Sequence, residues 1–202
     1  MHTDPLVYVV DNDQAMIDSL SWLIESVNLK VKTYKCTKKF LADYDPDQHS
    51  CILLDVRMPG MSGPELQKKL NSQNTNLPVI FIGGYVEVPL AIQTMKDGAI
   101  DFLIKPFNDK ILIESIQMAL SIDKNLRTKK QENHQYNEKI ALLSRREMQV
   151  LEGILASQQN KIISAKLNLS LKTVEAHRAS MMRKMNVSSV VELIKLVVLK
   201  GM

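Results

Sequence analysis

One short stretch governs the interpretation of the first half of the chain: VYVVDNDQ, Val7–Gln14. Its four leading apolar residues suit a buried strand, and the strand would end at two acids that flank an amide, Asp11, Asn12 and Asp13. One interpretation is local, with Asp11 or Asp13 capping the helix that follows. The other is a functional site at the end of the strand, and the rest of the chain must decide between the two.

The same apolar pattern recurs through residues 1–120, alternating with longer amphipathic segments. Strands are expected at Leu6–Val10, Lys30–Tyr34, Cys51–Leu54, Pro78–Ile82 and Asp101–Ile104. Helices are expected at Gln14–Val27, Thr37–Tyr44, Pro64–Gln73 and Val88–Asp97, and from Asp109 onward. Strands that alternate regularly with helices predict the α/β class, here a doubly wound five-stranded parallel sheet.

Charged residues follow three of these predicted strands. Asp11 and Asp13 come after the first, Asp55 after the third and Lys105 after the fifth. Ligands of such sheets gather where the carboxyl ends of the strands meet. The coincidence of three acids and a lysine favours a site there.

Charge divides the 202-residue chain into two unlike parts. Residues 1–123 carry 11 Lys and Arg against 16 Asp and Glu, a net charge of −5. Residues 124–202 carry 15 against 6, a net charge of +9. This asymmetry indicates two domains with different partners, and a small basic domain indicates a polyanion, nucleic acid first.

The cysteines and the hydropathy pattern place the chain in a reducing compartment. Cys36 and Cys51 cannot form a disulfide framework, and Cys51 lies in an apolar run that suits a buried free thiol. No apolar stretch approaches 18 residues, and no basic segment precedes an apolar one at the N-terminus. We therefore expect no membrane span, no standard export signal and a cytoplasmic protein.

Residues 140–202 carry only helix signals. A polar segment, 121–139, precedes them and is interpreted as a helical linker, with a disordered linker as the alternative. Ser144–Glu147 reads SRRE, a capping box. Further helices are expected at Lys161–Leu167, from a Ser170 cap to Met185, and from Ser188 or Ser189 to Leu199. Two short helices around a tight turn at Asn168 predict a helix-turn-helix, with Met181, Met182 and Met185 as core residues.

With these pieces in place, the sequence resembles a two-component response regulator of the FixJ type, a CheY-like receiver followed by a LuxR/NarL-type helix-turn-helix. The receiver motifs are VVDND, LLDVRMPGMSG, VPLAIQTMKDGA and GAIDFLIKPF. The effector motifs are LSRREMQVL, NKIISAKLNLSLKTVEAHRASMMRKM and SSVVELIKL. The resemblance covers nearly the whole chain and implies a receiver over 1–120, a linker over 121–139 and an all-α, four-helix DNA-binding domain over 140–202.

The resemblance assigns roles to the residues at the strand ends. Asp55 is similar to the carboxylate that accepts a phosphoryl group from a sensor histidine kinase. Lys105 is similar to the lysine that contacts the phosphoryl oxygens, and Pro106 matches a cis-peptide position. Mg²⁺ is the implied cofactor, a cation that takes hard oxygen ligands. Its implied ligands are Asp11, Asn12, Asp55 and the backbone carbonyl of Arg57.

Two positions depart from the family pattern. Asn12 stands where the family has a second acid, so the formal charge available to Mg²⁺ is smaller. Gly83 stands where the family has Thr or Ser, whose hydroxyl couples the phosphoryl group to the switching face. Phe102 occupies the usual aromatic switch position. The departure at Gly83 concerns the coupling step rather than phosphoryl transfer itself.

For DNA, the resemblance and the helix pattern indicate the helix that begins after Ser170. The expected DNA-contacting set is Lys172, Thr173, Glu175, Ala176, His177, Arg178, Ala179 and Arg183. Lys184 either contacts phosphate or pairs with Glu147 inside the domain. The apolar helix Val190–Leu199 is expected to supply a homodimer contact on double-stranded DNA, and RNA polymerase is considered as a further partner.

Three functions compete. The first is a transcription factor, not an enzyme, that phosphorylation of Asp55 activates. The second is a DNA-binding regulator that phosphorylation does not switch, which Asn12 and Gly83 motivate. The third is a phosphohydrolase with Asp55 as nucleophile; such enzymes carry a general acid two residues later, where this chain has Arg57.

Overall fold

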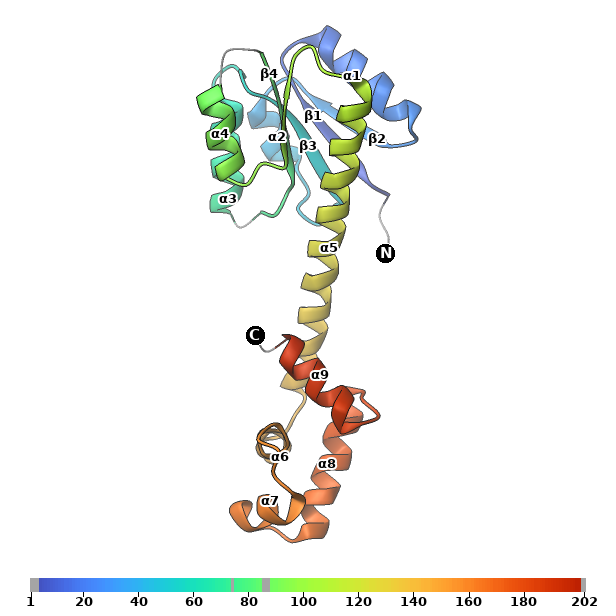
Figure 1. Cartoon of the computed structure of the whole chain (residues 1–202), viewed down its shortest axis with the longest axis vertical. Helices are drawn as coiled ribbons and strands as arrows, with labels where there is room; N and C mark the ends of the chain where they lie inside the picture. The colour runs from blue at the N-terminus through green and yellow to red at the C-terminus, as the bar shows by residue number, and fades with distance from the viewer. Residues whose placement is uncertain (1–3, 74, 85–87, 201–202) are drawn as a thin grey trace. The chain divides into compact units, whose positions relative to one another are not determined.

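The computed structural model describes residues 4–73, 75–84 and 88–200, apart from the side chains of Val88, Leu199 and Lys200. The chain folds into two compact units, Met1–Thr128 and Lys129–Met202. Figure 1 gives the labels of the helices and strands.

The first unit is built on a parallel sheet. Its strands are β1 (Leu6–Val10), β2 (Lys30–Tyr34), β3 (Ser50–Asp55), β4 (Val79–Gly83) and β5 (Asp101–Ile104), in the order β2-β1-β3-β4-β5. The central strand β3 is buried at all six positions, which explains its continuous apolar sequence. The edge strand β2 instead exposes Lys30 and Lys32, and charged side chains of this kind hinder edge-to-edge pairing.

Helices cover both faces of this sheet, as Figure 1 shows. They are α1 (Gln14–Ser26), α2 (Thr37–Asp43), α3 (Gly63–Ser72), α4 (Val88–Lys96) and α5 (Asp109–Ala141). One core cluster joins α1 and α5 to residues such as Val9 and Leu53, and a second joins α2 and α3 to Val10 and Leu54. Successive strand residues thus face opposite clusters. The doubly wound α/β prediction is confirmed.

The second unit packs four further helices around its own core. They are α6 (Arg145–Leu155), α7 (Asn160–Leu167), α8 (Leu171–Met185) and α9 (Val190–Lys200). The fully buried core includes Val150, Val174, Met181 and Met185, and Met182 packs against it. The prediction that these methionines are core residues is confirmed. The helical prediction for residues 121–139 is also confirmed, because they lie within α5.

Caps begin and end these helices where the sequence signals them. Ser144 and Glu147 form the predicted capping box of α6, and Asn168 has the left-handed conformation (φ 53°) between α7 and α8. Of the two serines considered for α9, Ser189 is the cap, because its Oγ accepts a hydrogen bond from Glu192 N at 3.1 Å.

Cys36 and Cys51 are free thiols, and Cys51 is buried. Within the described part of the chain, no helix is both long enough and apolar enough to cross a membrane.

Candidate functional site

Three ionisable side chains from three strand ends meet at the carboxyl edge of the sheet. Lys105 Nζ donates to Asp55 Oδ1 at 2.7 Å and to Asp11 Oδ2 at 2.9 Å. The strand order brings them together, since β1 and β3 are neighbours and β4 alone separates β3 from β5. The convergence inferred from the strand ends is therefore present in the structure.

The other carboxylate oxygens are held by the backbone of the loops that follow. Asp55 Oδ2 accepts from Arg57 N at 2.8 Å, and Asp11 Oδ1 accepts from Asp13 N at 2.9 Å. Asp13 itself is the N-cap of α1, since its Oδ1 accepts from Ala15 N at 2.9 Å. The two interpretations of the opening stretch thus apply to different residues: Asp13 caps the helix, and Asp11 faces the site.

Burial makes these charges interact strongly. Asp11 is 2% exposed and Asp55 9% exposed, and a carboxylate at such depth needs a cation or several donors. Burial by itself would lower the pKa of Lys105, but the hydrogen bonds and charges of Asp55 and Asp11 outweigh it, so the pKa is raised. Lys105 is therefore an ammonium ion at neutral pH.

The backbone next to Lys105 and next to Asp55 has local features of its own. The Lys105–Pro106 peptide bond is cis, as the resemblance implies, and Lys105 N donates to Gly83 O at 2.7 Å. Gly63, at the start of α3, approaches Asp55 so closely that a Cβ there would lie 2.5 Å from the Asp55 backbone oxygen. Only glycine fits, and Gly63 N donates to Val56 O at 3.1 Å.

The donor set at this edge fits a magnesium ion. Asp11 and Asp55 offer carboxylate oxygens, and the exposed Asn12 adds an amide on the same loop as Asp11. No cluster of three or more carboxylate, imidazole or thiol side chains that could hold a metal occurs among the described residues. An amide such as that of Asn12 is not one of these groups, so Asp11 and Asp55 are the charged ligands available here. A small hard cation that keeps several waters suits so few oxygen ligands.

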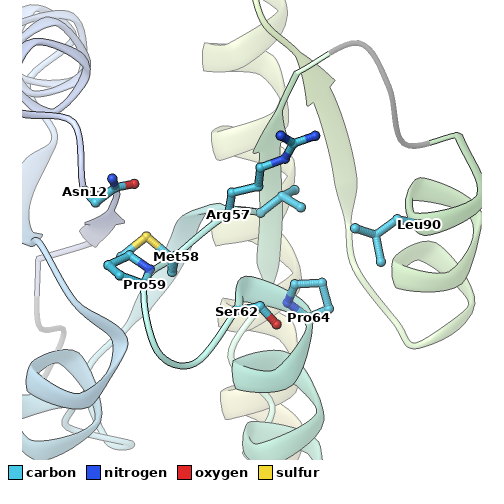
Figure 2. A pocket seen from close by; sticks show the side chains of 8 residues that line it. Asn12, Arg57, Met58, Pro59, Ser62, Pro64 and Leu90 are labelled. Carbon is cyan, nitrogen blue, oxygen red and sulfur yellow. The ribbon is translucent and has the colours of Figure 1, made fainter.

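A pocket of about 610 Å³ opens next to Val56 and the loop that follows β3. Figure 2 shows that its walls come from separate elements, with Asn12 on the β1–α1 loop, Arg57 to Pro59 after β3, and Leu90 on α4. Ser62 and Pro64 line it from the start of α3. The sequence reasoning missed this pocket, because no local pattern links Leu90 to the loop after β3.

Gly83 and Phe102 lie close to the acid site. Gly83 is the last residue of β4, and its missing side chain leaves space that Val56 Cγ2 and the Phe102 ring approach. Phe102 is half-buried and stacks on Phe81, with ring centroids 6.2 Å apart.

The predicted DNA-contacting residues lie on α8, and five of them are exposed: Lys172, Glu175, Ala176, Ala179 and Arg183. The others, Thr173, His177 and Arg178, are half-buried. Arg178 donates from Nη1 to Asn160 Oδ1 at 2.9 Å, a contact with α7 that the sequence reasoning missed.

Lys184 is half-buried and pairs with a buried carboxylate of its own domain. Its Nζ lies 2.7 Å from Glu147 Oε2 and donates to Leu142 O at 3.1 Å. Of the two roles considered for this lysine, the structure shows the pairing with Glu147, and the phosphate contact stays a prediction.

Comparisons with known proteins agree with this geometry. Residues 7–117 match the response regulator receiver domain, and residues 141–197 match the bacterial regulatory proteins of the luxR family. The transcriptional regulatory protein FixJ of Azorhizobium caulinodans is 40% identical over 96% of this chain and 92% of its own. The response regulator protein TodT of Pseudomonas putida is 37% identical over 94% and 84%.

Solved structures resemble the chain as well. The response regulator StyR matches with a TM-score of 0.91 at 37% identity, covering 96% of this chain and 98% of its own. Full-length FixJ from B. japonicum matches with a TM-score of 0.61 at 37% identity, covering 98% of both chains.

Proposed function

Because the chain belongs to the response regulators that join a receiver domain to a LuxR-type DNA-binding domain, we propose that phosphorylation of Asp55 controls its binding to duplex DNA. The phosphoryl donor is the phosphohistidine of a sensor histidine kinase. The observation that carries the proposal is the contact of Lys105 with both Asp55 and Asp11 at the carboxyl edge of the sheet.

The chemistry is one displacement at phosphorus. An Asp55 oxygen attacks the phosphorus of the phosphoimidazole, a P–O bond forms, the P–N bond breaks, and the imidazole nitrogen leaves with the bonding pair. Lys105 stays charged and offers its ammonium to the oxygens of the transferred group. Arg57 N and Lys105 orient the carboxylate before attack.

Asp11, Asn12 and Asp55 are the side chains that would hold Mg²⁺, with the Arg57 backbone carbonyl as the further ligand that the family implies. When bound, the ion neutralises charge on the phosphoryl oxygens. Because Asn12 brings no charge, we propose weaker Mg²⁺ binding than Asp would give, and Asn12→Asp should increase Mg²⁺ affinity.

Mass spectrometry of the intact protein tests the acceptor. With a small acyl phosphate and Mg²⁺, the wild-type chain should gain one phosphoryl group and Asp55→Asn none. Asp13→Asn is the matched control, since it removes a neighbouring carboxylate while asparagine keeps the helix cap. Equal phosphoryl gain in Asp55→Asn would exclude Asp55 as the acceptor.

The second unit is proposed to place α8 in the major groove. Its exposed face combines cations at Lys172 and Arg183 with small residues at Ala176 and Ala179, which allow close approach to base edges. Glu175 on the same face could accept from a cytosine amino group. Arg178 could reach phosphate only by leaving or sharing its contact with Asn160.

Salt dependence tests this assignment without knowledge of the operator. Arg183→Ala should weaken binding to any duplex and reduce the slope of log K against log salt by about 1. Lys130→Ala removes the same charge from an exposed position on α5 and should leave the slope unchanged. Equal slopes for both variants would remove Arg183 from the interface.

We further propose that two copies of the chain bind a two-fold symmetric DNA site. We place this binding in the cytoplasm, with RNA polymerase as a further partner. The apolar face of α9 supports the dimer, because Val191 and Val198 are exposed large hydrophobic residues. Val191→Lys should lower the cooperativity of DNA binding without unfolding the unit, and sedimentation of the complex would measure its stoichiometry.

A second candidate function is DNA binding that phosphorylation of Asp55 does not regulate. It is motivated by Asn12 and Gly83, the two positions that depart from the family pattern. It predicts equal operator affinity before and after phosphorylation of Asp55. A DNA titration on the samples used for mass analysis separates the two functions.

A further inference from the structure

We propose that Gly83 is a positioning residue that seats the Phe102 ring next to Val56 and keeps it there whether or not Asp55 carries a phosphoryl group. The inference rests on the proposed function, since it describes how the receiver responds at that site.

Val56 and the Phe102 ring crowd the position that a side chain at residue 83 would take. A Cβ on Gly83 would lie 2.9 Å from Val56 Cγ2 and 3.0 Å from Phe102 Cζ. Real Cβ atoms essentially never come closer than 3.0 Å to another heavy atom, so the Val56 contact would be too short and the Phe102 contact would lie at the limit. Any other residue at position 83 would force at least one of these two side chains to shift, and the glycine therefore allows both to lie where they do.

On its inner side the Phe102 ring also packs against the core. Phe102 stacks on Phe81 with an interplanar angle of 29°. Phe81 belongs to the core cluster that includes Val56, and the half-buried Phe102 packs against that cluster. Phe81 and Phe102 are also register partners in β4 and β5. Moving the ring outward would lose its stacking on Phe81 and its packing against this cluster.

Backbone hydrogen bonds link the segment around Gly83 to the acceptor strand and to Lys105. Val56 directly follows Asp55, and Ile82 directly precedes Gly83. Val56 N donates to Ile82 O at 3.1 Å. Gly83 O in turn accepts from Lys105 N at 2.7 Å. Position 83 thus lies between the acceptor strand and the Lys105 segment, yet glycine offers no polar side-chain atom to a group on Asp55.

Apolar contacts thus hold the Phe102 ring on one side, and glycine at position 83 gives it no polar link to the phosphoryl site on the other. A phosphoryl group on Asp55 then changes charge and hydrogen bonding around Lys105 without a contact that draws Phe102 with it. A structural change of the receiver on phosphorylation would then involve residues other than Phe102.

Fluorine NMR on the full chain tests the inference. The chain has four phenylalanines, so 4-fluorophenylalanine labelling yields few resonances, and Phe102→Tyr identifies that of Phe102. Spectra are recorded for wild type, Gly83→Ala and Gly84→Ala, before and after treatment with acyl phosphate and Mg²⁺. Gly84→Ala is the matched control, because a Cβ there meets nothing within 4 Å.

The expected result has two parts. Before treatment, the Phe102 resonance should shift in Gly83→Ala and stay in place in Gly84→Ala. After treatment, the wild-type resonance should stay in place in a sample whose intact mass shows the phosphoryl group. A wild-type Phe102 resonance that moves on phosphorylation would overturn the inference, as would an unshifted resonance in Gly83→Ala.

Failure of the proposed function gives a different pattern. If no mass gain occurs in any variant, Asp55 is not the acceptor under these conditions, while the untreated spectra still decide whether Gly83 seats the ring. If Gly83→Ala does not fold, a Phe102→Ala change in the same chain should restore folding, because it removes one of the two crowded neighbours. Absence of rescue would count against the inference.

Discussion

Glu147→Gln should destabilise the second unit by removing one buried charge. Glu147 Oε2 accepts from Lys184 Nζ and from Ser144 N, both at 2.7 Å, and the side chain is 4% exposed. Burial alone would raise the pKa of this carboxyl. Hydrogen bonds from Lys184, Ser180 and Ser144 outweigh burial and lower the pKa from 4.5 to about 2.

The size of the effect follows from linkage. Each pKa unit corresponds to about 1.4 kcal/mol, so ionised Glu147 stabilises the folded unit by roughly 3 kcal/mol at neutral pH. Glutamine keeps part of the hydrogen bonding, and Lys184, at 36% side-chain exposure, regains some hydration. We therefore expect a loss of about 2–3 kcal/mol in the free energy of unfolding at pH 7.

The pH dependence has a definite sign. Because the folded-state pKa is lowered, the stabilisation is fully present above pH 4.5 and is lost as pH falls toward 2. The difference between wild type and Glu147→Gln should therefore shrink steadily over this interval.

Calorimetry of the full chain at several pH values measures the transition of the second unit. Glu152→Gln is the matched control, an exposed acid on the same helix, and should stay within about 0.5 kcal/mol of wild type. A Glu147→Gln effect that matches the control, or that persists unchanged at pH 3, would refute the reasoning.

Three further variants test the two cores and the acid site. Lys105→Met leaves two buried carboxylates without their cation and should cost roughly 2–4 kcal/mol at pH 7, measured by calorimetry of the first unit and relieved by acid. Gly63→Ala forces a Cβ against the Asp55 backbone oxygen and should cost about 1–3 kcal/mol in urea unfolding, whereas Gly84→Ala should be neutral. Met185→Ala empties a fully buried position and should cost about 2–5 kcal/mol in the second unit; a loss below about 1 kcal/mol would mean that the core closes around the gap.

Local sequence determines most of the secondary structure of this protein. The limits of β1, β2 and β5 agree with prediction at both ends, and those of β3 and β4 differ from prediction by one residue at each end. Alternating apolar runs and amphipathic segments carry this information, because each element buries a face that its own spacing defines. Side-chain caps sharpen the helix starts, as Ser144 does for α6.

The sequence also predicts where the acid site lies. Asp11, Asp55 and Lys105 each follow a strand, and a parallel sheet collects such residues at one edge. The resemblance then supplied their roles. Spacing alone could not tell Asp11 from Asp13, since both are acids in the same loop and only hydrogen-bond geometry separates the cap from the site.

Tertiary structure alone decided which partners these side chains take. Lys105 reaches Asp11 across 94 residues, Lys184 reaches Glu147 across 37, and Arg178 reaches Asn160 across 18. The space at Gly83 is filled by Phe102 from the neighbouring strand. No local pattern encodes such pairs, because burial and packing select one partner among many of suitable charge or size, and that selection exists only once the chain has folded.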